Sequence, residues 1–159
     1  MKKVILLVFF LICATFTEHN KEFAKTEYDA VDIIAENEDR SVKKEYVISN
    51  WEDEVSFTAQ KFDGRETVWQ KKYEESQNVE GKLMFTLTAG KAKLVHIDQE
   101  GNVTTIAECT PDSGIKEMTS CTIPMKEGKN RLKMVGYGCQ DIDFQLELEL
   151  VQEDEGGEQ

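Results

Sequence analysis

Residues 141–151 read DIDFQLELELV, and this stretch decides the fold class. Apolar side chains occupy every second position, and acidic or amide residues fill the gaps; the apolar residues are Ile142, Phe144, Leu146, Leu148 and Leu150. A period of two is that of a β-strand with one apolar and one polar face. Because the apolar face needs a cover, the stretch predicts a sheet packed against a second layer.

The same pattern extends back to about residue 43, where short runs of β-branched and aromatic residues alternate with turn signals such as Asp63-Gly64. Nine strands are predicted, over residues 43–49, 54–62, 65–73, 82–89, 91–98, 103–109, 119–125, 130–137 and 141–151. Only the segment before residue 41 offers a helical pattern, which excludes parallel βαβ crossovers. We therefore expect an all-β, antiparallel, jelly-roll-like β-sandwich of eight or nine strands over residues 41–152, with an acidic tail over 153–159.

The first seventeen residues, MKKVILLVFFLICATFT, have the features of an export signal. Two lysines precede an unbroken apolar run that is shorter than the ~20 residues of a membrane-spanning helix. Cleavage is expected after Ala14, Thr15 or Thr17. Residues 18–40 show no sustained pattern and are expected to be an acidic, largely disordered spacer.

Cys13 follows the apolar run directly, as the lipidated first residue of a bacterial lipoprotein does. That signal normally has a small residue before the cysteine, and Ile12 occupies the place here. The sequence thus leaves open whether Cys13 is lipidated or removed with the signal.

The charge balance narrows the class of partner. The chain of 159 residues has 31 acidic and 19 basic side chains, a formal net charge of −12. Phosphate backbones and anionic lipid surfaces repel such a chain, so nucleic-acid binding is not expected. Contact with a membrane is expected only through a lipid anchor at Cys13.

Three further cysteines, Cys109, Cys121 and Cys139, lie in the predicted sandwich. Export permits disulfides, and an odd number leaves one thiol over. Cys109 ends one predicted strand and Cys121 lies in the next, so a Cys109–Cys121 disulfide is favoured, with Cys139 in its Gly-rich turn as a competing partner. Metal binding by these thiols is the alternative, but the chain lacks a CxxC pair, and no metal or cofactor is expected.

Residues 81–106, GKLMFTLTAGKAKLVHIDQEGNVTTI, and 126–148, KEGKNRLKMVGYGCQDIDFQLEL, share a pattern of strands joined by Gly-containing turns. In this pattern the chain resembles small exported β-sandwich domains of Gram-positive bacteria, many of which are lipoproteins. The resemblance implies a secreted or cell-surface location. Some relatives of this general shape bind carbohydrate, and the resemblance brings no catalytic motif with it.

Candidate reactive groups are few. His96 lies in a predicted strand with Asp98 as its nearest acid, and His19 lies in the spacer. A hydrogen-bonded strand histidine is the simpler interpretation of His96. Residues 98–102, DQEGN, resemble part of a calcium loop but lack its distal glutamate, so a turn with Gly101 at positive φ is favoured. No GxSxG motif is present, and paired acids for glycoside cleavage are uninformative among so many carboxylates.

The aromatic residues Trp51, Trp69 and Tyr73 are the candidate binding residues. In WQKKY (69–73), Trp69 and Tyr73 share one side of a strand. If that side faces outward, it offers a platform for a glycan or a protein; if it faces inward, it belongs to the core, the commoner place for large aromatic residues.

These observations favour a non-catalytic, secreted or cell-surface interaction module that binds a glycan or an envelope protein. A purely structural accessory domain without a small ligand is the alternative. A hydrolase acting on envelope material comes third, because no nucleophile, base and orienting group occur together. The sequence does not indicate the oligomeric state.

Overall fold

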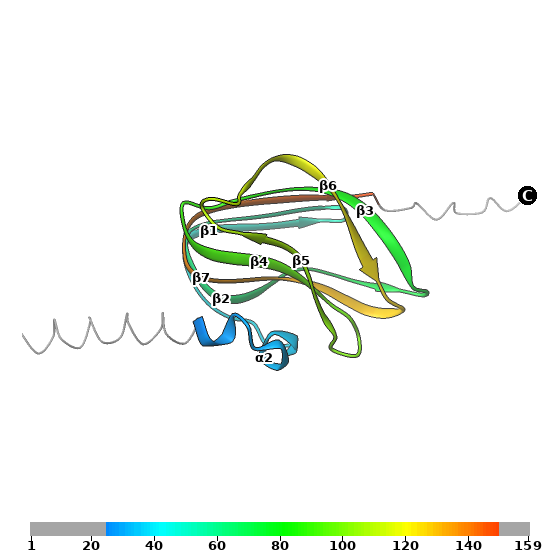
Figure 1. The fold of residues 1–159 in the computed structure, drawn as a ribbon. Helices are drawn as coiled ribbons and strands as arrows, with labels where there is room; N and C mark the ends of the chain where they lie inside the picture. Colours follow the sequence, from blue (N-terminus) through cyan, green and yellow to red (C-terminus); the bar gives the residue numbers. More distant parts are fainter. Residues whose placement is uncertain (1–24, 150–159) are drawn as a thin grey trace, which may run out of the picture.

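The computed structural model describes residues 25–149, which form two packed β-layers with a short N-terminal segment against one of them (Figure 1). Its elements are helix α2 (Val31–Ala35) and strands β1 (Arg40–Trp51), β2 (Glu54–Tyr73), β3 (Gln77–Thr86), β4 (Ala89–Ile97), β5 (Val103–Cys109), β6 (Ile115–Met125) and β7 (Gly128–Leu148). All strand pairs are antiparallel. The predicted all-β antiparallel sandwich is thus confirmed.

The two layers share their longest strands. Layer A has the order β1-β2-β7-β3-β6 and uses the first half of β2 and the last half of β7. Layer B consists of the other halves of β2 and β7, followed by β4 and β5. Strands β2 and β7 pair along their whole length, from Glu54 opposite Glu147 to Tyr73 opposite Gly128, so one two-stranded ribbon passes through both layers.

A bend in this ribbon makes the corner between the layers. The alternation of buried and exposed residues fails there, because both Gln60 and Lys61 are exposed on β2 and the facing residues of β7, Gln140 and Asp141, are exposed as well. Asp141 adopts a positive φ of 48°, and the register shifts between Phe62 and Gly64. Bulges and left-handed residues are the usual means by which a strand turns from one sheet into the other.

The bend corrects the predicted strand count from nine to seven. The segments 54–62 and 65–73 belong to one strand, as do 130–137 and 141–148, so the expected hairpin at Asp63-Gly64 is wrong. Gly64 has φ 115°, and a Cβ there would collide with the carbonyl oxygen of Arg40. The glycine is therefore needed for a close approach of β1 within a bent strand and not for a chain reversal.

The inward faces of the two layers form the main core. Phe85 and Phe144 contact each other edge to face, with ring centroids 5.3 Å apart. The apolar residues of the stretch that predicted the fold are buried as expected: Ile142, Phe144, Leu146 and Leu148. Leu150 lies outside the described residues.

The N-terminal strap, residues 25–39, covers the outer face of layer B. Tyr28 and Ile34 are each only 1% exposed and pack in a second apolar cluster with Val95, Ile97 and Val135. The expectation of a disordered spacer up to residue 40 is therefore wrong for residues 25–39. A few apolar side chains suffice to dock the segment because the sheet beneath it offers charged partners.

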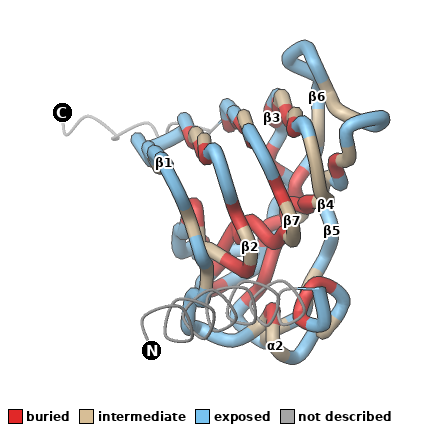
Figure 2. The backbone as a smooth tube through the Cα atoms, turned by 90° about the vertical axis from the view of Figure 1, so that its left-hand side faces the viewer, coloured by how far each residue is buried: buried red, intermediate tan, exposed pale blue. Residues whose placement is uncertain are grey.

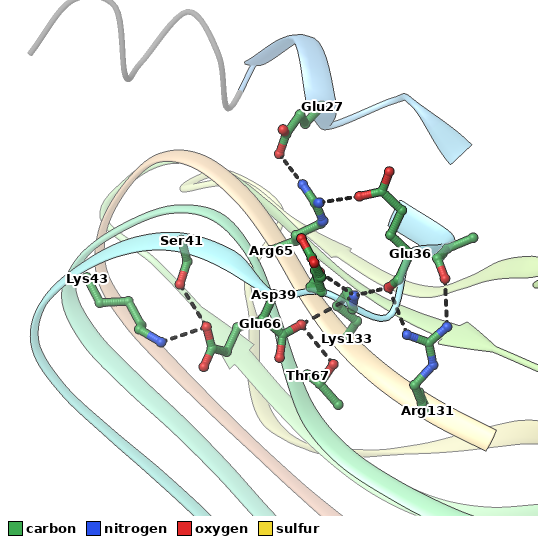
Figure 3. A network of polar contacts seen from close by, with 12 residues as sticks. Glu27, Glu36, Asp39, Ser41, Lys43, Arg65, Glu66, Thr67, Arg131 and Lys133 are labelled. Atoms are coloured by element: carbon green, nitrogen blue, oxygen red, sulfur yellow. Dashed lines mark hydrogen bonds and ion pairs between the residues drawn. The ribbon is translucent and has the colours of Figure 1, made fainter. Parts of the chain in front are cut away.

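Among those partners are the buried cations Arg65, Arg131 and Lys133 (Figure 3). The guanidinium of Arg65 pairs with Glu27 at 2.6 Å and with Glu36 at 2.7 Å. Arg131 donates to the carbonyl oxygens of Ala35, at 2.7 Å, and Glu36, at 2.8 Å. Lys133 donates to the same Glu36 carbonyl at 2.8 Å. The strap thus supplies both the charge and the backbone acceptors that a buried cation requires.

The predicted Cys109–Cys121 disulfide is wrong, because the three cysteines among residues 25–149 are free thiols. Cys109 lies on β5 in layer B, and Cys121 lies on β6 in layer A. The thiol of Cys109 donates to the carbonyl of Phe85, and that of Cys139 donates to the carbonyl of Lys91, each at 3.2 Å. The prediction assumed that the strand of Cys109 and the strand of Cys121 are neighbours, but β5 pairs with β4 and β6 pairs with β3.

The export signal over 1–17, Cys13, the first part of the predicted spacer and the acidic tail over 153–159 lie outside the described residues. Within residues 25–149, no helix has the length and apolarity needed to cross a membrane.

The strap generates a stability prediction. Glu27→Ala leaves the guanidinium of Arg65 buried with only one carboxylate, and we expect a loss of about 2–3 kcal/mol in the free energy of unfolding. Glu36→Ala is the matched control, because it removes the other carboxylate from the same guanidinium but its side chain is 54% exposed. Urea unfolding of both variants should show a loss below about 1 kcal/mol for Glu36→Ala. Equal losses in the two variants would contradict the assigned role of Glu27.

Candidate binding surface

The structure separates the three predicted binding residues. Trp69 and Tyr73 are buried, with 2% and 7% exposure, so their interpretation as an outward platform is wrong. The indole Nε1 of Trp69 donates to the carbonyl of Glu52 at 3.1 Å, and burial raises the pKa of Tyr73. Trp51 is 72% exposed and remains as the one candidate of the three on the surface.

Trp51 ends β1 on the outer face of layer A. The strand registers place it opposite Glu54, then Glu147 on β7, Lys82 on β3 and Ser120 on β6. Residues that face each other across paired strands project to the same side of a sheet, so these five side chains form a row across layer A. At ~4.8 Å between strands, the row is about 19 Å long.

A hollow of about 170 Å³ lies along this row. Its lining is mainly charged and consists of Asp53, Glu54, Lys82, Glu147, Leu148 and Glu149. Carboxylates accept hydrogen bonds and the ammonium group of Lys82 donates them, so the hollow can bind hydroxyl groups of either orientation.

A larger polar hollow of about 320 Å³ lies at the same end of the sandwich, where layer A meets layer B. Asn50 closes this edge, because its side-chain amide donates to the carbonyl of Val68 at 3.1 Å. The lining combines amide and charged side chains with the edge of the core: Asn37, Asp39, Asn50, Thr67, Val68, Trp69, Gln70, Lys129 and Arg131. Its volume falls at the lower end of the range for small-molecule sites, about 300–1,000 Å³.

Part of this larger hollow was missed by the sequence analysis. Asn37 and Asp39 belong to the strap, and Asp39 accepts a hydrogen bond from Thr67 at 2.9 Å. The strap residues were assigned to a spacer because their sequence lacks periodicity. No local pattern shows that an irregular segment forms a wall of a hollow, since that depends on the docking described above.

In the sequence, Trp51 lies between residues that line the larger hollow and residues that line the smaller one. Asn50 lines the larger hollow, and Asp53 and Glu54 line the smaller one. Asn50 and Trp51 project to opposite sides of β1, as neighbours in a strand do. The end of β1 therefore presents one exposed aromatic ring with polar groups on both sides.

His96 is hydrogen-bonded, as the simpler interpretation required. It is 2% exposed, and its Nε2 lies 2.7 Å from the side-chain oxygen of Asn130. The amide nitrogen of Asn130 donates to two backbone carbonyls, those of Lys126 and Gly128, which leaves its oxygen as the acceptor and Nε2 of His96 as the donor. This network holds the turn before β7.

The turn at residues 98–102 is also the one expected. Asp98 accepts hydrogen bonds from the backbone amides of Glu100 and Asn102, each at 2.9 Å, and Gly101 has φ 86°. Burial opposes the ionisation of Asp98, but the hydrogen bonds from Asn102 and Glu100 outweigh it and lower its pKa. Within residues 25–149, no group of three or more His, Cys, Asp or Glu side chains is placed to bind a metal ion.

Comparisons with known proteins give structural likenesses only. No protein-family model matches the chain, and no curated protein matches it. Among solved structures, it is similar to a variant of a family 29 carbohydrate-binding module complexed with mannohexaose, at 9% identity and a TM-score of 0.41 over 70% of this chain and 79% of that one. It is also similar to a family 29 module at 8% identity and TM-score 0.40, over 70% of this chain and 77% of that one. At these values the likeness assigns neither a ligand nor an activity to this chain.

The environment of His96 predicts a pH dependence. Burial lowers the pKa of His96 below 6.5, despite the hydrogen bond to Asn130. The unfolded chain therefore binds a proton at a higher pH than the folded chain does. We expect full stability above the unfolded pKa and a loss as the pH falls through 6.5 toward the folded pKa, at most about 1.4 kcal/mol per pH unit.

Urea unfolding at pH 7 and pH 5 measures this loss. His96→Gln keeps a donor for Asn130 and removes the titration, so the difference in stability between the wild type and the variant should shrink or reverse at the lower pH. A difference that does not change with pH would contradict the assignment.

Proposed function

We propose that this chain is a non-catalytic module that binds a glycan at the end of β1. The observation that carries the proposal is the 72% exposure of Trp51 at the end of a polar row and beside two polar hollows. Covering a large indole ring lowers the free energy, and Trp is enriched among the residues that contribute most to binding.

A sugar ring matches this arrangement. It has an apolar face of C–H groups, which packs on an indole, and a rim of hydroxyl groups, each of which both donates and accepts. Glu54 and Glu147 supply acceptors along the row, and Lys82 supplies a donor. The row crosses several strands of layer A, so it suits an oligosaccharide better than a single sugar.

The position of His96 supports a binding role without catalysis. It is the one histidine among residues 25–149, and its side chain is buried and bonded to Asn130. It therefore does not line either hollow at the end of β1.

We further propose that the module is exported and acts outside the cell or at its surface. Support comes from MKKVILLVFFLICATFT at the start of the chain. Mass spectrometry of the mature N-terminus tests this: a chain that starts after Ala14, Thr15 or Thr17, or an acylated chain that starts at Cys13, agrees with the proposal. A cell-associated chain that retains Lys2 and Lys3 contradicts it.

Trp51→Ala tests the binding site. Affinity electrophoresis through gels that contain uncharged soluble polysaccharides, a mannan and a β-glucan, should show retardation of the wild type in at least one gel. Loss of an aromatic anchor of about 2 kcal/mol corresponds to an affinity roughly thirtyfold lower. The variant should therefore migrate freely.

Val42→Ala is the matched control, because Val42 is 55% exposed on the same strand but lies at its other end. This variant should be retarded like the wild type. Binding that survives Trp51→Ala, or that is lost equally in Val42→Ala, would place the glycan elsewhere. An absence of retardation in every gel would count against a glycan ligand.

A further inference from the structure

Strand β1 is an edge strand with an unusual surface. It pairs with β2 on one side, and no pairing joins its other side to the rest of residues 25–149. Figure 2 shows it pale blue along most of its length. Six large apolar residues of the described chain are exposed, and four of them lie on β1: Val42, Tyr46, Val47 and Trp51.

The two halves of β1 differ in their protection against pairing. The first half, RSVKKE (40–45), contains four charged residues, and Glu45 has a left-handed φ of 46°. Lysines and local distortions are the devices that keep edge strands from pairing with other chains. The second half, YVISNW (46–51), has no charge, no proline and no glycine, which is the composition of a segment that pairs readily.

The charges at the two ends of the uncharged half have opposite signs. Residues 40–45 have a net charge of +2, from three basic residues and one acidic residue. The turn that follows the strand begins with Glu52 and Asp53. A strand with a basic start and an acidic end is complementary to a second copy of itself in antiparallel orientation, whereas a parallel copy would bring like charges together.

We infer that this chain forms a two-fold symmetric dimer in which β1 pairs antiparallel with β1 of a second copy, centred on Ile48. In this register Lys44 lies opposite Glu52 of the partner, and the symmetry forms that pair twice. Lys44 can take this position because its side chain is 60% exposed and its ion pair with the neighbouring, similarly exposed Glu45 is long, at 3.4 Å.

The same register brings two of the exposed apolar residues, Tyr46 and Val47, against the partner, whereas Val42 lies beyond the paired segment. Tyr46 lies opposite Asn50 of the partner, and Val47 lies opposite Ser49 of the partner. Trp51 lies at the end of the paired segment and projects to the outer face of layer A, so the pairing does not require its ring. Layer A of one copy then continues into layer A of the other, and the outward backbone groups of the uncharged half of β1 form hydrogen bonds with the partner.

Sedimentation velocity on the full mature chain tests the dimer. The wild type should show a concentration-dependent monomer–dimer equilibrium that weakens as salt is raised, because the outer pairs are ionic. Val47→Lys, at a position that is 61% exposed, should abolish the dimer. Val42→Lys places the same charge on the protected half and should leave the dimer intact. Circular dichroism should show the same fold in both variants.

A charge exchange tests the register. Lys44→Glu should weaken the dimer at least tenfold, as should Glu52→Lys, because each places like charges opposite each other. The double variant should recover the wild-type dissociation constant. A monomer at all concentrations overturns the inference and leaves the β1 edge to another protein. A dimer that survives Val47→Lys, or no recovery in the double variant, also overturns it. None of these measurements depends on glycan binding.

Discussion

The pairing of β2 with β7 is the constraint on which the rest of the structure depends. These strands are hydrogen-bonded from end to end, and every other strand attaches to one of them directly or through one neighbour. Because the ribbon bends near Gln60 and Asp141, one uninterrupted pairing creates both layers and brings their apolar faces together. The position of the bend therefore determines the size of each layer and the place where the edges of the two layers meet.

The outer face of layer B shows how charge completes a fold that apolar contacts begin. This face carries the buried cations Arg65, Arg131 and Lys133, and it would be exposed to solvent without the strap. Buried cations are tolerated only with partners nearby, and the strap supplies two carboxylates to Arg65 and carbonyl oxygens to the other two. The segment and the sheet thus depend on each other, although they are far apart in the sequence.

The sequence predicted the features that depend on local alternation. The buried face of residues 142–148, the antiparallel sandwich and the turn at Asp98 follow from periodicity and turn chemistry, and all are confirmed. The prediction of a hairpin at Asp63-Gly64 was wrong because the same dipeptide can also occupy a bend within one strand, as it does where β7 continues past it. The predictions of a disordered spacer and of an outward-facing Trp69 failed for another reason. Both features depend on contacts between segments that lie far apart in the chain.

The candidate binding surface was predictable only where local sequence determines exposure. Trp51 is followed by three acidic residues, which keep the end of its strand at the surface, whereas Trp69 and Tyr73 lie in a strand that both layers share. Exposure of an aromatic residue follows from its place in the sheet order, and a single sequence does not reveal that order. The hollows beside Trp51 likewise form only where β1, the strap and the ends of β2 and β7 meet.

The direction of β1 has a consequence for tethering. The strand runs away from the described start of the chain and ends beside the point where the chain leaves the sandwich at residue 149 (Figure 1). A chain held at a surface by its N-terminal end would therefore hold the indole of Trp51 on the side remote from that surface. Its distance from residue 25 would then be about the length of the whole sandwich.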